Sequence, residues 1–89
     1  MKASNDFILR EIAGETLLVP VGAGAARING LVALNELGCF IFKALSSEQT
    51  AASIAAQIAA EYDVTPETAE ADTLEFLQQL RSIGALDEQ

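Results

Sequence analysis

The sequence predicts an α+β domain in which a three-stranded antiparallel sheet is followed by three helices. Three observations predict this fold class. Two β-prone runs flank Gly14, a third short apolar run ends at Asn35, and the apolar residues after Asn35 recur at three- and four-residue spacing. Strands followed by helices are typical of the α+β class. With 89 residues the chain can form one small domain with one core.

The first two strands are expected at residues 7–12 and 15–21, because both runs are rich in Ile, Leu and Val. Gly14 between them favours a tight hairpin that needs a positive φ. The third strand is expected at residues 31–34. Residues 1–6 are polar and are expected to be a disordered N-terminus. Residues 7–89 are then the single folded domain.

The first helix is expected to begin at Asn35, directly after the third strand and without a loop. Asn is a preferred N-cap, because its side-chain oxygen accepts from free backbone N–H groups of the first turn. Leu37, Phe40 and Ile41 begin an apolar face that continues to about Leu45. Gly38 costs helix stability, and we expect it to permit close packing against the sheet.

The second helix is expected from a cap at Thr50 to a point near Tyr62, with a narrow apolar face of Ala and Ile. Thr65 caps the third helix and Pro66 occupies its first position, where proline is tolerated. The third helix runs to about residue 83, before Gly84. These two helices resemble a helix-turn-helix, and the attached sheet makes the predicted architecture winged-helix-like.

The charge distribution argues against nucleic acid as a partner. The chain has 13 acids and 5 bases, a net charge of −8. Residues 61–89 contain eight acids and one base, Arg81, so this part contributes −7. The third helix, which would be the recognition helix of a DNA-binding protein, is therefore acidic. DNA-binding surfaces need a basic footprint, because they neutralise phosphates.

Composition also argues against catalysis by this chain. It has no histidine, which removes the commonest general base and metal ligand. Cys39, its one thiol, lies among apolar residues without an adjacent base, so we interpret it as a packing residue. The acids of the third helix surround a regular helix and are expected to be solvated. We therefore expect no enzyme activity, no catalytic residues, no metal site and no cofactor.

The single cysteine allows no internal disulfide, and the N-terminal residues have no secretory pattern. A cytoplasmic location is therefore expected. No apolar run approaches the roughly 20 residues of a membrane span, so no membrane partner is expected.

Several segments together resemble the PqqD-like family, in an order and spacing that cover nearly the whole chain. Residues 7–14 and 19–22 are similar to the family's opening hairpin, and residues 29–42 look like the start of the family's domain. The other similar segments are residues 50–54, 61–64, 72–80 and 84–86. Ser46 and Ser47 stand where members of the quinone pathway tend to have Asp-Gly, which favours a related peptide pathway over pyrroloquinoline quinone biosynthesis itself.

The resemblance implies a function. The family contains the peptide chaperone of pyrroloquinoline quinone biosynthesis and recognition elements of pathways for ribosomally made, post-translationally modified peptides. It implies a stand-alone, non-enzymatic module that binds the leader of a precursor peptide. The leader adds as a strand to the edge of the third strand, against the third helix. The domain then presents the peptide to a modifying enzyme, often a radical S-adenosylmethionine protein.

The expected peptide-binding residues come from the third strand and from one side of the third helix. Leu74 is apolar although the inner face of the helix does not need it, so it could form a groove floor or be an ordinary exposed leucine. Arg81 lies on the same flank and could pair with a leader carboxylate or simply be solvated. The expected set is Leu31, Val32, Ala33, Leu34, Glu70, Leu74, Leu77, Gln78 and Arg81.

Two other functions stay open at this level. One is a winged-helix transcription regulator, and the other is a small protein-interaction domain without a peptide ligand. A homodimer also stays open, because Phe7, Ile8, Leu9 and Ile12 place apolar groups on both faces of the first strand.

We predict no measurable affinity for duplex DNA at physiological salt, because the helix that would enter the groove is acidic. Fluorescence anisotropy with random duplexes and with DNA from upstream of the gene measures this. Tight, salt-sensitive binding would contradict the prediction and favour the transcription regulator.

Overall fold

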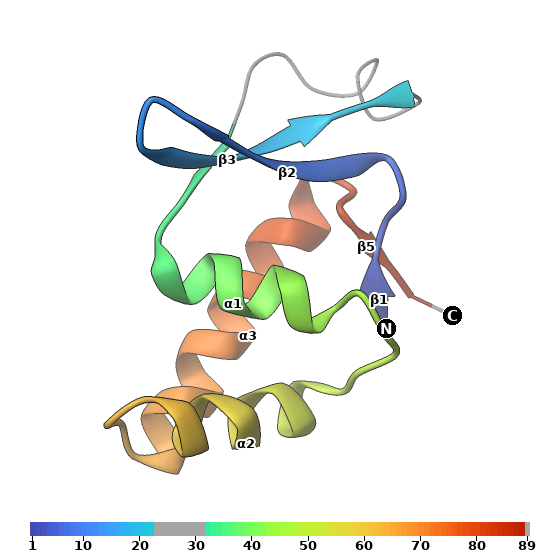
Figure 1. Ribbon diagram of the computed structural model, residues 1–89. Helices are drawn as coiled ribbons and strands as arrows, with labels where there is room; N and C mark the ends of the chain where they lie inside the picture. The colour runs from blue at the N-terminus through green and yellow to red at the C-terminus, as the bar shows by residue number, and fades with distance from the viewer. Residues whose placement is uncertain (23–31, 89) are drawn as a thin grey trace.

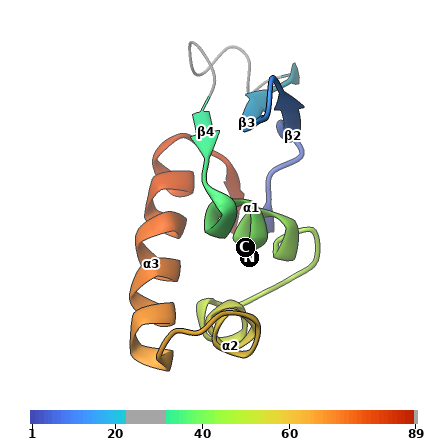
Figure 2. The ribbon, with the colours of Figure 1, turned by 60° about the vertical axis from the view of Figure 1, so that its left-hand side comes forward.

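A three-stranded antiparallel sheet lies across one end of three helices in the computed structural model, which describes residues 1–22 and 32–88 (Figure 1). The helix α1 lies next to the sheet, α2 lies farthest from it, and α3 runs alongside both (Figure 2). The predicted α+β class is confirmed. The elements are β1 (Lys2–Ala3), β2 (Phe7–Ile12), β3 (Glu15–Pro20), β4 (Val32–Leu34), α1 (Glu36–Ala44), α2 (Ala51–Glu61), α3 (Pro66–Ser82) and β5 (Leu86–Asp87).

The hairpin between β2 and β3 turns within two residues. Ile12 faces Glu15 in the register, and the turn residues Ala13 and Gly14 have φ of 54° and 83°. The predicted positive φ at Gly14 is confirmed. Positive φ at both central residues is the pattern of a type I′ turn, whose twist matches that of the flanking strands. Ala13 also adopts this conformation, although alanine is not among the residues that favour it.

The short strand β4 forms one edge of the three-stranded sheet. The strand order is β2-β3-β4, and β4 pairs antiparallel with β3 so that Leu18 faces Val32 and Thr16 faces Leu34. Within the described residues no strand pairs with the other side of β4. Leu31, the expected first residue of this strand, lies outside the described residues.

The three-stranded sheet has one face toward the helices and one face away from them. Side chains alternate along β2, so Phe7 is buried while its neighbour Ile8 is 37% exposed. Leu18 of β3 lies on the inner face and is completely buried. Ile12 shares the outer side of β2 with Ile8 and is 49% exposed. The expectation of apolar groups on both faces of this strand is thereby confirmed.

The first residues of the chain lie against its last residues. The strand β1 pairs antiparallel with β5, with Ala3 facing Leu86. The backbone N–H of Ala3 also donates to the carbonyl of Leu45, and the N–H of Ser4 donates to that of Ala85. We expected residues 1–6 to be disordered; the structure instead places Lys2 and Ala3 in a two-stranded sheet, with Ala3 in backbone contact with the end of α1.

The three helices begin at the predicted caps. The Asn35 side chain accepts from the backbone N–H of Gly38, at 2.8 Å. Thr50 and Ser53 form a reciprocal capping box at α2, and Thr65 accepts from Thr68 N–H at α3. Each cap satisfies N–H groups that lack a partner within the helix. Within residues 1–22 and 32–88, no helix has the length and apolar character needed to cross a membrane.

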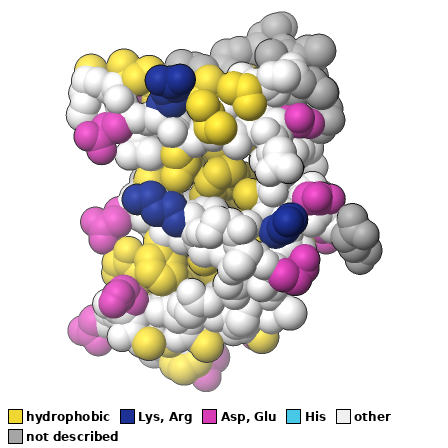
Figure 3. Space-filling model, turned by 45° about the vertical axis from the view of Figure 1, so that its right-hand side comes forward, with side chains coloured by type: hydrophobic (Ala, Val, Ile, Leu, Met, Phe, Trp, Pro, Cys, Tyr) yellow, Lys and Arg dark blue, Asp and Glu magenta, His cyan; other side chains and the backbone are white. Residues whose placement is uncertain are grey.

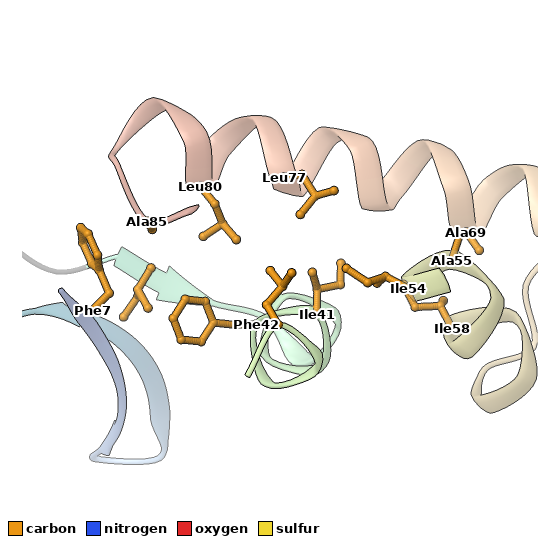
Figure 4. Close-up of a cluster of buried hydrophobic side chains, with 12 residues drawn as sticks. Phe7, Ile41, Phe42, Ile54, Ala55, Ile58, Ala69, Leu77, Leu80 and Ala85 are labelled. Atoms are coloured by element: carbon orange, nitrogen blue, oxygen red, sulfur yellow. The ribbon is translucent and has the colours of Figure 1, made fainter. Parts of the chain in front are cut away.

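One aliphatic core joins the sheet and the helices. Figure 4 shows core side chains of α1, α2 and α3 pointing toward one another, with Phe7 and Ala85 at the end nearer the sheet. Thr73 of α3 is a polar side chain in this core and is fully buried. Its hydroxyl donates to the carbonyl of Ala69 at 2.7 Å. That bond satisfies the hydroxyl donor, so a threonine is tolerated where an aliphatic residue would otherwise be expected.

Gly38 brings α1 close to α3. A Cβ atom at this position would lie 3.0 Å from Cε1 of Phe76 and 3.2 Å from the capping Oδ1 of Asn35. The sequence led us to expect that Gly38 permits close packing on the sheet. Its close contact is instead with the aromatic ring of α3, because this part of α1 faces α3.

We predict that Gly38→Ala destabilises the fold by up to about 2 kcal/mol. Alanine gains about 1 kcal/mol of helix propensity, but displacing the Phe76 ring and the Asn35 cap costs roughly 1–3 kcal/mol. Urea unfolding of Gly38→Ala, Phe76→Leu and the double variant measures the coupling. The cost of Gly38→Ala should be smaller in the Phe76→Leu background. A stabilised Gly38→Ala variant would contradict the contact.

Candidate functional site

A groove lies between the free edge of β4 and one side of α3. The capping residue Asn35 follows β4 directly, so the strand edge and the start of α1 border the groove together. Leu37 of α1 and Phe76 of α3 contribute apolar surface, and Ile41 is fully buried beneath them. The lining residues that the structure describes are Ala33, Leu34, Asn35, Leu37, Gly38, Ile41, Asp72, Glu75, Phe76 and Gln79.

The strand edge supplies backbone hydrogen-bonding groups to this groove. In an antiparallel sheet, an edge strand directs part of its N–H and C=O groups away from its neighbour. Ala33, in the middle of β4, is exposed, and Val32 and Leu34 are half-buried. The edge is short because the chain enters α1 at Asn35. An extended segment of a few residues can therefore pair with it.

The α3 side of the groove is acidic. Asp72 and Glu75 line it, both side chains are exposed, and within the described residues neither has an ion-pair partner. Gln79 continues the polar rim along the same flank of α3. No Lys or Arg is among the lining residues that the structure describes. The described part of the groove therefore combines an apolar floor with negative charge on one wall.

The residues predicted from β4 lie where they were expected, at the sheet edge. Ala33 and Leu34 line the groove, and Val32 precedes them in the same strand. Leu31 belongs to the segment outside the described residues, so its position is not assigned.

The residues predicted from α3 do not line this groove. Leu77 is 2% exposed and belongs to the core. Successive helical residues are separated by about 100°. Thr73 and Leu77 mark the buried face of α3, and Asp72 and Phe76 lie on one side of it. The other side carries Glu70, Leu74, Gln78 and Arg81. Leu74 is exposed there, by 51%. The structure thus brings the β4 residues together with a different flank of α3 from the one we named.

Arg81 is already engaged by another side chain. Its Nε donates to Oε1 of Glu88 at 2.7 Å and its second guanidinium nitrogen to Oε2 at 3.1 Å. A third bond reaches Gln78. The hydrogen bonds and charge attraction between Arg81 and Glu88 raise the pKa of Arg81 and lower that of Glu88. A leader carboxylate that paired with Arg81 would therefore have to displace Glu88 from an existing bidentate pair.

Sequence reasoning missed four groove residues of α3, namely Asp72, Glu75, Phe76 and Gln79. It also did not name Asn35, Leu37, Gly38 and Ile41, at the start of α1 and within it, as site residues. The spacing of three and four residues along α3 does identify one flank of a helix. We named only the flank that carries Leu74. The signal in favour of the other flank was Phe76, a large aromatic residue at the border of the inner face, opposite the helix-start glycine Gly38.

The described residues offer no arrangement suited to metal binding: within residues 1–22 and 32–88, no group of three or more Cys, Asp or Glu side chains could hold a metal ion. Cys39 is half-buried and unpaired among these residues. What the groove offers chemically is a free strand edge, an apolar floor and negative charge, which suits binding of an extended polypeptide segment.

The fold and the groove together define a small α+β domain with an unpaired sheet edge beside a helix. The family model for coenzyme PQQ synthesis protein D (PqqD) matches residues 13–86, and the chain belongs to this family. The predicted family resemblance is confirmed.

A solved structure described as TbiB1 in complex with the TbiA(beta) leader peptide is similar to this one. The TM-score is 0.77 and the sequence identity is 27%, over 100% of this chain and 98% of the matched chain. No curated protein matches the chain.

Proposed function

We propose that this chain is a recognition module for the leader of a ribosomally made precursor peptide, which it holds for a modifying enzyme. The observation that carries the proposal is the free edge of β4 beside the groove on α3. Membership of the PqqD family and similarity to a protein in complex with a leader peptide support it. A transcription regulator is not favoured, because α3 has four acids and one base, Arg81. That base is paired with Glu88.

The leader binds by adding a strand to β4. Main-chain hydrogen bonds to β4 supply affinity for any extended segment, and side-chain pockets supply specificity. Leu37, Ile41 and Phe76 form an apolar floor that takes an aliphatic or aromatic side chain of the leader. Burial of such a side chain contributes about 1.5–3 kcal/mol.

The acidic wall specifies the charge of the leader at one position. A leader side chain over Asp72 and Glu75 would be repelled if it were acidic and attracted if it were basic. We infer that the segment bound in the groove carries a Lys or Arg there. The modifying enzyme then acts on the rest of the peptide, which extends beyond the groove.

We predict that Glu75→Lys weakens leader binding about three- to tenfold, because an attraction becomes a repulsion at a solvent-exposed site. Glu70→Lys is the matched control: it makes the same change on the same helix, at an exposed position on the other flank. Isothermal titration with the leader of the precursor encoded beside this gene measures both. If both variants weakened leader binding equally, Asp72 and Glu75 would not determine specificity for a basic leader residue.

We also predict that Leu74→Glu changes leader affinity by less than about twofold, because Leu74 lies outside the groove. The residue set expected from the sequence predicts a clear loss instead. Amide chemical-shift mapping of the same titration separates the two assignments. The largest shifts should fall on Ala33, Leu34 and the Asp72–Gln79 flank. A silent β4 edge, or shifts centred on Leu74 and Gln78, would make the groove assignment wrong.

A further inference from the structure

A second hollow lies at the other edge of the three-stranded sheet. Within the described residues β2 is the opposite edge strand from β4. The hollow is bordered by β2, by the chain that leads into it and by the last turn of α1. Its lining residues are Lys2, Ala3, Ser4, Asn5, Phe7, Ile8, Leu9, Phe42, Lys43, Leu45 and Ser46.

The floor of this hollow is apolar. Phe7, Phe42 and Leu45 are buried beneath it, and Leu9 is half-buried. Ile8 remains 37% exposed at its border. Figure 3 shows this face, where hydrophobic side chains within a depression are flanked by Lys and Arg side chains. An apolar depression with a charged rim is typical of a binding surface.

Positive charge gathers around the hollow although the chain has a net charge of −8. Lys2 and Lys43 line it, and Arg10 lies two residues beyond Ile8 on the same side of β2. Within the described residues none of these three side chains has an ion-pair partner, whereas Arg81 is held by Glu88. Among the described residues that line the hollow there is no acid. The charge is therefore the reverse of that on the groove at β4.

We propose that this hollow binds a segment of the protein that modifies the bound peptide. The segment is acidic and has an apolar residue at its centre. The identity of that partner rests on the proposed function; the chemistry of the segment rests on the hollow itself. Its acidic groups would pair with Lys2, Lys43 and Arg10, and its apolar residue would cover Ile8, Leu9 and Phe42. A short segment of this kind is complementary in charge to the hollow, whereas an extended anionic lipid surface or nucleic acid would also face the negative charge of the rest of the molecule.

The geometry allows the leader and the partner to bind together. Neighbouring strands lie about 4.8 Å apart, so the axes of β2 and β4 are separated by roughly 10 Å, with β3 between them. A strand added at β4 therefore does not reach the hollow at β2. The domain can hold the peptide at one edge and the modifying protein at the other.

The test uses two synthetic peptides and the full chain. One is the acetylated, amidated pentapeptide Glu-Leu-Glu-Leu-Glu, and the other replaces each Glu with Lys. We expect saturable amide shifts at Ile8, Leu9 and Lys43 with the acidic peptide, and none there with the basic peptide. Rising sodium chloride should reduce the shifts, because the ion pairs are exposed.

Charge-reversal variants test the named lysines. The double variant Lys2→Glu and Lys43→Glu should weaken binding of the acidic peptide about tenfold. The double variant Lys2→Gln and Lys43→Gln should weaken this binding less. Arg81→Glu is the control, because it reverses a cation away from the hollow. Circular dichroism melting verifies that each variant is folded. Leader affinity should change by less than about twofold in the lysine variants.

Five results would overturn the proposal. Three concern the acidic peptide: shifts at Ala33 and Leu34 in place of β2, no saturable shift, or equal binding to the lysine variants. Binding to phosphatidylglycerol vesicles that the lysine variants lose would assign the surface to a membrane, and a lysine-dependent dimer in light scattering would assign it to a second copy. If the leader does not bind but the acidic peptide still binds at β2, the proposed function is rejected. The assignment of this docking surface is then unaffected.

Discussion

The junction at Asn35, where β4 ends and α1 begins without a loop, fixes the geometry of the candidate site. Its side chain caps α1 through the N–H of Gly38, and Gly38 in turn lies against the ring of Phe76. These contacts hold the end of an edge strand, the start of one helix and the middle of another together. The groove exists because β4 must stop at the cap, beside α3, with its other side unpaired within the described residues.

The domain separates its charges between the two edges of the sheet. Asp72 and Glu75 border the groove at β4, and Lys2 and Lys43 border the hollow at β2. Both places have an apolar floor, so burial of apolar side chains can supply affinity while opposite charges select different partners. A module that must hold a peptide and also meet the protein that modifies it benefits from two such distinguishable surfaces.

The pairing of β1 with β5 supports this arrangement. Lys2 belongs to β1, whose pairing with β5 places the first residues of the chain beside the last turn of α1. Without that pairing Lys2 would not border the hollow. The small two-stranded sheet thus contributes to a surface as well as to the packing of Ala3 and Leu86 against the core.

Local chemistry allowed much of the fold to be predicted from the sequence. Gly14 predicted the hairpin, and Asn35, Thr50 and Thr65 predicted the helix starts, because turns and caps depend on residues close in sequence. The short apolar run ending at Asn35 predicted the strand that forms the edge. The acidic third helix predicted that DNA is an unsuitable partner.

The rest of the site depends on contacts between distant residues. Apolar periodicity identifies the buried face of α3, but the flanks on either side of it look alike in sequence, and the packing of α3 on α1 decides which one faces β4. Because Gly38 lies against Phe76, the flank that carries Asp72 and Glu75 faces β4. The flank that carries Glu70 and Leu74 does not. The pairing of Lys2–Ala3 with Leu86–Asp87 is equally hidden, because two residues are too few to show a strand pattern. The sequence by itself determined the elements and the edge, and only the tertiary structure decided what lies beside them.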